Sequence, residues 1–315
     1  MLYITGITGH SGKWFLERLE KEGYRGKIRC VMKEKKSAAP EKYEIFENRK
    51  LDVEFAVGSL EDEAFLLESL KGVRTILHIA GINLSPGIVK SAMLNKVDWI
   101  ILVHTTGRFS KYKSASQEYI RIEDAILELC KESLQGLHKL NCTILRPTMI
   151  YGSSKDKNMY RLVNYLDRHV LFPLFGDGSN LMQPVHARDL GNAYYDVLVH
   201  KDATLNKAYN LSGAEPITYR NIIQTIRSQL GSKTAIVSLP MSLSILAAKV
   251  YNFLFKNAII TVEQVMRMQE DKDFNHDEAS RDFGYAPLRF EDGIKEEVEE
   301  YLSGVRIDFS DVRYR

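Results

Sequence analysis

The chain has 315 residues, of which 44% are hydrophobic, so it is long enough for one large domain with a smaller companion. Its 43 basic and 41 acidic residues nearly cancel, which argues against a nucleic-acid-binding protein, because such proteins carry a basic stripe or face. Three widely spaced cysteines and eight histidines without paired helical spacing predict neither a disulfide framework nor a metal site.

The chain opens with a predicted strand, a glycine turn and a helix. Residues 2–4 are apolar, and residues 13–21 carry apolar side chains at helical spacing. Between them, Gly6 permits a tight bend, Gly9 lets a pyrophosphate approach the backbone and Gly12 lets the helix pack on the strand. The start of the helix offers free amides and a positive dipole end to phosphates. The turn therefore predicts a nicotinamide dinucleotide site; the alternative is a glycine turn that binds no ligand.

The same opening strand bears on the location of the protein. Residues 1–4 lack the charged stretch and apolar run of a signal peptide, and no apolar run reaches membrane-spanning length. We therefore expect a cytoplasmic protein with no membrane span.

Apolar and amphipathic segments alternate along the rest of the first half. Strands are predicted at 27–33, 53–57, 75–80, 99–104 and 142–145, and helices at 41–49, 61–71, 86–94 and 117–133. Strands that alternate with helices form a parallel sheet with right-handed crossovers. The pattern predicts an α/β fold with a Rossmann doubly wound parallel sheet, which binds its ligands at the carboxyl ends of the strands.

The second predicted strand ends in Lys33 rather than in an acidic residue. A carboxylate at this point binds the ribose 2′-hydroxyl of NAD and repels a 2′-phosphate, whereas a cation favours NADP. Lys33 therefore favours NADP as the cofactor. NAD stays possible, because Glu34 is adjacent and can take the acidic role.

Several motifs occur in order along essentially the whole chain. They are the glycine signature at 5–12 and the segments 58–62, 78–81, 146–152, 175–178, 184–190, 282–287 and 290–294. Together they resemble the motifs of the extended and atypical short-chain dehydrogenases/reductases, the group that includes the NAD-dependent epimerase/dehydratase family and the nucleoside-diphosphate-sugar epimerases.

The resemblance implies which residues contact a cofactor and a substrate. In segment 58–62, Ser59 replaces the usual aspartate beside adenine. On the substrate side, the resemblance implies His186 and Arg188, since arginine forms bidentate pairs with a diphosphate; an ordinary surface ion pair is the alternative for Arg188. The implied cofactor-binding residues are Gly6, Thr8, Gly9, His10, Ser11, Gly12, Lys33, Ser59, Leu60, Ala80, Gly81, Pro147, Thr148 and Met149.

The resemblance also implies an interleaved architecture. Residues 1–151, with about 184–212, would form the NAD(P)-binding Rossmann domain, and 208–211 would return to the sheet as a seventh strand. Residues 152–183 and 213–315 would form a smaller α/β substrate-binding domain. Extended members of the group often pair through helices beside the fourth and fifth strands, so a homodimer is consistent with the resemblance.

Catalysis in these enzymes relies on a Tyr-x-x-x-Lys pair and on a serine or threonine. The lysine and the nicotinamide charge favour tyrosinate, which lets the tyrosine act as an acid/base near neutral pH. Tyr119 lies on the helix that follows Thr105 and Thr106, and either threonine can replace the serine. However, the residue four places after Tyr119 is Glu123, and a carboxylate there disfavours tyrosinate.

A second alignment of this helix removes both catalytic residues. The family helix often reads Lys-x-x-x-Glu in its second half. If Glu123 is that glutamate, Tyr119 stands in the place of the lysine and Ala115 in the place of the tyrosine. Tyr112 is a further candidate, again without a lysine four residues later. Such losses resemble the atypical branch, which includes NmrA-like regulators and complex I accessory subunits.

The sequence thus supports two functions. The first is an NAD(P)-dependent oxidoreductase or epimerase that acts on a nucleotide-sugar-like or carbonyl substrate, with Tyr119, Thr105 and Thr106 as catalytic residues. The second is a catalytically inactive NAD(P)-binding regulatory or assembly protein. Glu123 favours the second, whereas the intact substrate-side segments around Gly176 and His186 favour the first.

Residues 238–260 are unusually apolar. The pattern predicts a buried helix of the substrate domain. The alternative is a helix on the surface that binds a membrane or a partner.

Overall fold

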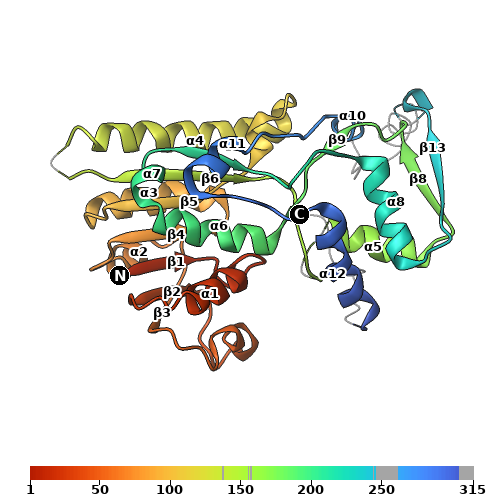
Figure 1. Cartoon of the computed structure of the whole chain (residues 1–315). Coiled ribbons are helices and arrows are strands. Elements are labelled where there is room, and N and C mark those ends of the chain that lie inside the picture. The colour runs from red at the N-terminus through yellow and green to blue at the C-terminus, as the bar shows by residue number, and fades with distance from the viewer. Residues whose placement is uncertain (137, 155, 157, 244, 246–261, 305–315) are drawn as a thin grey trace. The chain divides into compact units, whose positions relative to one another are not determined.

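The computed structural model describes residues 1–136, 138–154, 156, 158–243, 245 and 262–304, and the chain divides into two units (Figure 1). Unit 1 comprises Met1–Thr148, Ala187–Leu211 and Asn275–Ala286. Unit 2 comprises the remaining segments, Met149–His186, Ser212–Phe274 and Pro287–Arg315. Each unit therefore gathers segments that lie far apart in the sequence.

Unit 1 is built on a seven-stranded parallel sheet in the order β11-β6-β5-β4-β1-β2-β3. The strands are β1 (Leu2–Thr5), β2 (Ile28–Met32), β3 (Val53–Val57), β4 (Thr75–His78), β5 (Trp99–Val103), β6 (Asn141–Pro147) and β11 (Ala208–Leu211). This order confirms the predicted Rossmann sheet. The direction of winding reverses between β1 and β4, and ligands of such sheets bind at the carboxyl ends of the strands at this point.

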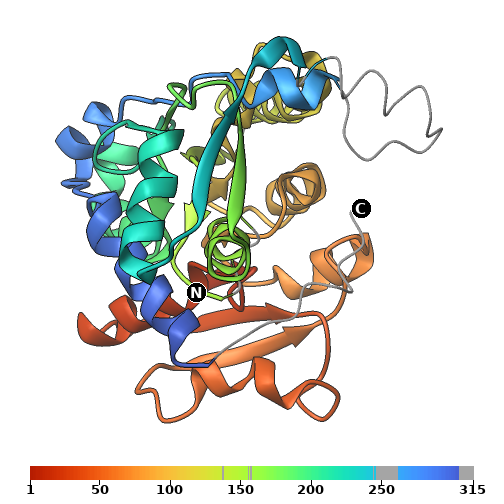
Figure 2. The same ribbon diagram turned by 90° about the vertical axis from the view of Figure 1, so that its right-hand side faces the viewer.

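Helices cover both faces of the sheet in unit 1 (Figures 1 and 2). One layer holds α2 (Glu63–Ser69), α3 (Ser85–Leu94) and α4 (Lys113–Ser133), which contact one another in sequence order. The other layer holds α1 (Gly12–Lys21), α6 (Ala187–Val199) and α11 (Asp277–Phe283), and the short α7 (Lys201–Thr204) adjoins α6. Because both faces are covered, the central strands are buried along almost their whole length. All five residues of β5, Trp-Ile-Ile-Leu-Val, are buried.

The segment between β2 and β3 differs from the helix predicted at 41–49. It forms two 3₁₀ turns, η1 (Pro40–Lys42) and η2 (Glu44–Phe46). Tyr43 and Phe46 both pack edge-on against Phe55 of the edge strand β3, with ring centroids 4.9 Å apart. Side chains three residues apart line up on a 3₁₀ turn, so this packing favours the tighter geometry over an α-helix.

Asn275–Ala286 belongs to unit 1, although the motifs placed it in the second domain. Its helix α11 contacts β11 and α6. Asp282 at the end of the helix accepts hydrogen bonds from the Lys207 ammonium at 2.7 Å and the Tyr209 hydroxyl at 2.8 Å. These bonds, together with Phe283 against the Tyr209 ring, hold the segment to the edge of the sheet.

Unit 2 combines short strand pairs with three helices around one core. β7 (Ile150–Tyr151) pairs with β10 (Val185–His186), β9 (Leu181–Met182) with β12 (Ile217–Thr218), and β8 (Leu171–Phe175) with β13 (Ala235–Leu239). The helices α5 (Met159–Arg168), α8 (Tyr219–Leu230) and α12 (Phe290–Leu302) contact one another. The short α10 (Val262–Arg267) lies between α8 and α12 in the sequence and belongs to the same unit. Their buried side chains include Tyr160, Val163, Ile222, Ile226, Ile294 and Val298.

The apolar stretch 238–260 is described only in part. Residues 238 and 239 close β13, whereas 244 and 246–260 lie outside the described residues. The prediction of a buried helix there stays a prediction. Among the helices that the structure does describe, none has the length and apolarity needed to span a bilayer.

Candidate cofactor and active site

The glycine turn after β1 requires glycine at two of its three positions. Gly6 has a φ of +72°, and a Cβ there would lie 2.6 Å from the backbone nitrogen of Ala80. A Cβ on Gly12 would lie 1.8 Å from the carbonyl oxygen of Ile7. Both contacts are impossible, so these glycines let the turn fold against β4 and against the start of α1.

Gly9 is different, because the fold itself gives it more room. Among the described residues, a Cβ on Gly9 would meet only the carbonyl oxygen of Gly6, at 3.1 Å. The residue is exposed at the tip of the turn, between the half-buried Thr8 and His10. The bare backbone at Gly9 fits the close approach of a pyrophosphate, and an added side chain would occupy that space.

The start of α1 faces this turn without an acidic residue in its first turn. The hydroxyl of Ser11, the residue before the helix, bonds to the Tyr194 hydroxyl at 3.1 Å instead of capping the helix. The positive end of the helix dipole is therefore not offset by a side-chain carboxylate of the first turn, as an anion site requires.

A buried histidine lies beneath the turn. His78 ends β4, and its Nδ1 shares a hydrogen bond of 2.6 Å with the hydroxyl of Thr5 at the end of β1. Burial, with a smaller contribution from the nearby His104, lowers the pKa of His78 from 6.5 to about 3. His78 is thus a neutral link between the two strands at the point where the winding reverses.

The residues after β2 place opposite charges side by side. Lys33 is exposed and follows directly after the strand. The neighbouring Glu34 accepts a hydrogen bond of 2.5 Å from the ammonium of Lys42, and this bond lowers the pKa of Glu34. The carboxylate that could take the NAD role is therefore paired with a cation of the same loop.

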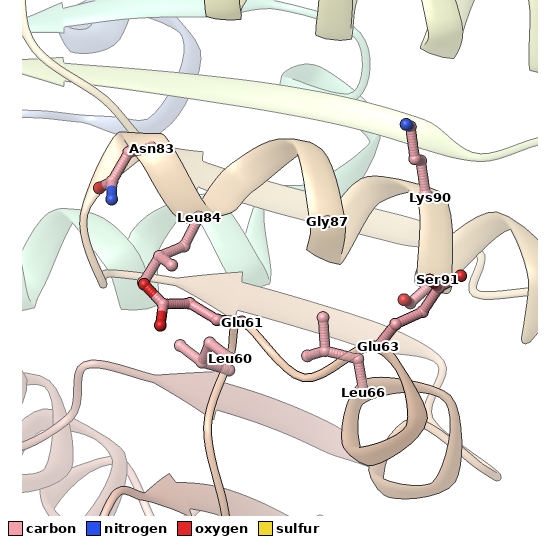
Figure 3. Close-up of a pocket in the computed structure, with 9 residues that line it drawn as sticks. All are labelled: Leu60, Glu61, Glu63, Leu66, Asn83, Leu84, Gly87, Lys90 and Ser91. Atoms are coloured by element: carbon pink, nitrogen blue, oxygen red, sulfur yellow. The ribbon is translucent and has the colours of Figure 1, made fainter.

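A pocket of about 450 Å³ lies beside the loop after β3 and the loop after β4 (Figure 3). Leu60 and Glu61 come from the first loop, next to Ser59, whose hydroxyl accepts from the Glu61 amide at 3.2 Å. They face Leu84, three residues after Gly81. The residues that line the pocket are Leu60, Glu61, Glu63, Leu66, Asn83, Leu84, Gly87, Lys90 and Ser91. The predicted cofactor-binding residues Ser59, Leu60, Ala80 and Gly81 thus lie on the two loops that border this pocket.

The two predicted catalytic threonines point in different directions. Thr106 is buried, and its hydroxyl donates to the carbonyl of Pro147 at 3.3 Å. The half-buried Thr105 caps the following 3₁₀ turn, η4 (Thr106–Phe109), and its hydroxyl accepts from the Gly107 amide at 3.0 Å. Of the two, Thr105 offers the more accessible hydroxyl.

Tyr119 lies next to Thr105 across Gly107. A Cβ added to Gly107 would lie 3.0 Å from Cε2 of Tyr119 and 3.3 Å from Oγ1 of Thr105. The tyrosine ring, half-buried on α4, therefore packs on the turn that Thr105 caps. Tyr112 instead precedes the first residue of α4, and Ala115 lies in its first turn.

Glu123, one helical turn after Tyr119, is completely buried in a cluster of cations. Its carboxylate accepts from Arg146 Nε at 2.9 Å and Nη2 at 2.5 Å, from Arg108, and from Nδ1 of His104 at 2.9 Å. Burial raises the pKa of Glu123, but the bonds from His104 and Arg146 outweigh it and lower the pKa to about 2. No role was predicted for His104 or Arg108. The one signal was that His104 is a polar residue directly after a buried strand.

The remaining predicted residues divide between the two units. Pro147 and Thr148 end the first unit at β6, and the Thr148 amide donates to Leu211 at 3.1 Å, whereas Met149 begins unit 2. Arg188 lies on α6 in unit 1, with its guanidinium 4.7 Å from the centre of the Trp14 ring on α1. His186 is buried in unit 2, with its ring centroid 5.2 Å from that of Tyr151. Arg188 therefore lies beside the glycine-turn helix rather than in unit 2.

Comparison with known proteins gives a family match in the second third of the chain. Residues 109–212 match the NAD dependent epimerase/dehydratase family. Among curated proteins, the chain is 23% identical over 261 residues to the uncharacterized protein y4nG of Sinorhizobium fredii. It is 23% identical over 168 residues to short-chain dehydrogenase/reductase family 42E member 1 of Danio rerio. These matches cover 75% and 48% of this chain but only 65% and 43% of the two relatives, less than two thirds of either length.

Solved structures share the fold over nearly the whole chain. The crystal structure of gox2253 has a TM-score of 0.77 at 19% identity, covering 98% of this chain and 99% of that one. The dTDP-glucose 4,6-dehydratase DesIV of Streptomyces venezuelae, with NAD and TYD bound, has a TM-score of 0.72 at 17% identity, covering 96% and 97% of the two chains. The UDP-glucuronic acid 4-epimerase of Bacillus cereus, with UDP-glucuronic acid and NAD, has a TM-score of 0.71 at 16% identity, covering 96% and 99%. The match to the family and the shared fold confirm the resemblance that the motifs indicated: the chain is similar to the extended short-chain dehydrogenases/reductases of the NAD-dependent epimerase/dehydratase family.

Proposed function

We propose that the chain is an NAD(P)-dependent oxidoreductase or epimerase of the extended short-chain dehydrogenase/reductase type. The observation that carries the proposal is the turn at Gly6, Gly9 and Gly12. Two of these glycines are required by the fold, and the third leaves bare backbone at the tip, in front of a helix start without a first-turn acid. This combination fits a dinucleotide pyrophosphate.

NADP is the proposed cofactor. Lys33 stands at the end of β2, where a ribose 2′-phosphate would lie, and Glu34 is engaged by Lys42. Pro147, Thr148 and Met149 are the proposed nicotinamide-side contacts, and Ser59, Leu60, Ala80 and Gly81 are the proposed adenine-side contacts. The NAD found in the similar dehydratase and epimerase structures is the alternative cofactor.

The proposed chemistry lies at the carboxyl end of β5. A bound nicotinamide would donate or accept the hydride at its C4 position. The Thr105 hydroxyl would hold the substrate oxygen, and the Tyr119 hydroxyl would give or take the proton on that oxygen. The proposal rests on the packing of both side chains around Gly107.

A nucleotide-sugar-like or carbonyl compound is the proposed substrate. The similar structures include a dTDP-glucose 4,6-dehydratase and an epimerase with UDP-glucuronic acid bound, and both of these named compounds are nucleotide sugars. His186 in unit 2 and Arg188 in unit 1 stay the proposed substrate contacts. The position of Arg188 beside Trp14 on α1 suits an anionic group close to the cofactor as well.

A second function is favoured by Glu123. The lysine that activates tyrosine in these enzymes is missing. The carboxylate that stands four residues after Tyr119 is hydrogen-bonded to Arg108, Arg146 and His104. A chain of this kind can bind the cofactor without turnover. The second candidate is therefore a catalytically inactive NAD(P)-binding regulatory or assembly protein.

Replacing the two proposed catalytic side chains distinguishes these functions. We expect the wild-type chain to turn over at least one member of a panel. Carbonyl compounds with NADPH and nucleotide sugars with NADP+ are followed by cofactor absorbance. Epimerisation returns the hydride to the substrate, so nucleotide sugars are also analysed by chromatography for an epimerised product. Tyr119→Phe and Thr105→Val should each lower kcat by about a hundredfold, because each removes a hydroxyl that contacts the reacting oxygen, and should leave the Kd for NADPH unchanged.

Tyr24→Phe is the matched control, since Tyr24 lies near the amino ends of β1 and β4, away from the site. Unchanged turnover in Tyr119→Phe would exclude Tyr119 as the acid/base. Saturable NADPH binding by a wild-type chain that turns over no panel member would support the inactive binding protein.

A further inference from the structure

The buried ring of His104 joins two helices of unit 1 directly below the proposed catalytic turn. Its Nδ1 lies 2.9 Å from Oε2 of Glu123 on α4, and its Nε2 lies 3.2 Å from Oγ of Ser85, the first residue of α3. Both partners are completely buried, and the side chain of His104 is fully buried as well. The row Ser85–His104–Glu123 thus runs from one helix to the next across the end of β5.

The charges around Glu123 fix the direction of the stronger bond. An ionised carboxylate can only accept, and Arg146 and Arg108 stabilise the ionised form of Glu123. Nδ1 of His104 must therefore carry the proton and donate it to Glu123. The second bond joins Nε2 to the Ser85 hydroxyl, which can donate to a bare Nε2 or accept from a protonated one. Donors and acceptors are matched at every step, as a buried polar row requires.

This row lies next to Thr105 in the chain and next to Tyr119 on the helix. His104 directly precedes Thr105, and its own backbone amide donates to the Leu145 carbonyl of β6 at 2.8 Å. Tyr119 and Glu123 are one helical turn apart and share a face of α4. That face therefore makes two contacts with the segment 104–107: Glu123 binds His104, and Tyr119 packs on Gly107.

We propose that His104 is a positioning residue for the proposed reaction. By binding Glu123 and Ser85, it holds the turn of Thr105 and Gly107 in register with α4, which keeps the Thr105 hydroxyl beside the Tyr119 ring. The effect on turnover rests on the proposed function, whereas the effect on the turn does not.

Three substitutions separate the two bonds of the ring. The amide nitrogen of His104→Asn can replace Nδ1 and keep the bond to Glu123. The amide of His104→Gln reaches the place of Nε2 and keeps the bond to Ser85, and His104→Leu keeps neither. Because a hydrogen bond to a charged group is the stronger of the two, Asn should rescue the turn better than Gln, and Gln better than Leu.

Hydrogen exchange in the full-length chain tests the proposal without a substrate. In His104→Leu, the amides of residues 105–109 should exchange about tenfold faster than in wild type, or more. From fastest to slowest exchange, the expected order is Leu, Gln, Asn and wild type. His138→Leu is the control, because His138 binds the Val97 carbonyl near the amino end of β5, whereas His104 lies at its carboxyl end. Its exchange at 105–109 should equal that of the wild type.

Turnover adds a second readout. With the panel substrate that the wild type uses, the His104 variants should lower kcat in the same order while the Kd for NADPH stays within about twofold. Equal exchange at 105–109 in His104→Leu and wild type would overturn the proposal, as would an order without rescue by Asn. A wild-type chain that binds no NADPH would overturn the proposed function instead, and the exchange data would still decide the role of His104.

Discussion

At the scale of single residues, the choice of cofactor depends on two neighbours of opposite charge. Lys33 would attract a ribose 2′-phosphate, and Glu34 would bind a free 2′-hydroxyl and repel the phosphate. The sequence places both at the end of β2 and leaves the choice open. The bond between Lys42 and Glu34 adds what the sequence could not, since it pairs the acidic side chain within its own loop. We therefore propose Lys33 as the residue that discriminates between the two cofactors.

Reversing the charge of Lys33 should therefore reverse the preference. We expect Lys33→Glu to weaken NADPH binding about tenfold or more and to leave NADH binding unchanged or tighter, because the carboxylate repels only the 2′-phosphate. Fluorescence titration of both cofactors gives the two Kd values. Lys71→Glu makes the same change in net charge near the start of β4 and should alter neither. Equal effects of both variants on NADPH would exclude Lys33 as a phosphate ligand.

At the scale of elements, α12 in unit 2 is held to the segment after β7 by a buried acid. Oε2 of Glu297 accepts from the Gly152 amide at 2.8 Å, and Glu300 accepts from the Ser154 amide at 3.2 Å. Burial, with smaller contributions from the nearby Asp156 and Glu300, raises the pKa of Glu297 from 4.5 to about 9. Glu297 is therefore neutral at pH 7 in the folded chain, whereas it is ionised in the unfolded chain. This difference lowers the free energy of unfolding at neutral pH.

This raised pKa predicts a stability that depends on pH. The contribution of Glu297 is fully favourable below about pH 4.5 and is lost as the pH rises to about 9. Glu297→Gln removes the ionisation, so the loss, roughly 3–5 kcal/mol by pH 8, should disappear. Thermal unfolding at pH 5 and pH 8 should show a smaller drop in Tm for Glu297→Gln than for wild type. The exposed Glu299→Gln should behave as wild type, and an equal drop in all three proteins would contradict a raised pKa.

The elements themselves were largely predictable, because the strands of a covered parallel sheet are short apolar runs between polar segments. β5 and β4 begin where the pattern places them. The boundaries of helices were less predictable: α4 begins at Lys113, four residues before the predicted start. The helix expected at 41–49 was wrong, because packing of Tyr43 and Phe46 on Phe55 depends on a strand that only the tertiary fold brings near.

The side-chain pairs of the candidate site were not predictable from local pattern. Glu123 lies on α4 and Arg146 near the end of β6, and their bond depends on how the helix packs against the sheet. From the sequence, Glu123 could therefore be interpreted only through its spacing from Tyr119. In the structure, Arg108 of η4 and Arg146 of β6 neutralise the Glu123 carboxylate. The relevance of Glu123 to the site therefore lies in its contact with the segment 104–107 rather than in its charge near Tyr119.

At the scale of the whole molecule, each unit collects distant segments, and local periodicity cannot reveal such interleaving. The return of β11 to the sheet was expected from the family resemblance alone, and β11 pairs in parallel with β6. The docking of Asn275–Ala286 in unit 1 was not expected, since it depends on the bonds of Asp282 with Lys207 and Tyr209. Of the proposed cofactor-binding residues, Met149 lies in unit 2 and the others lie in unit 1.

The central claim is that the glycine turn of unit 1 binds a nicotinamide dinucleotide. Gly9 tests it most directly, because a side chain there meets only the Gly6 carbonyl among the described residues and would fill the place of the pyrophosphate. Calorimetric titration of the full chain with NADPH and NADH should show one saturable site in wild type. In Gly9→Val, the Kd should rise at least about tenfold while the melting temperature without cofactor changes little. No saturable binding in wild type, or an unchanged Kd in Gly9→Val, would contradict the account.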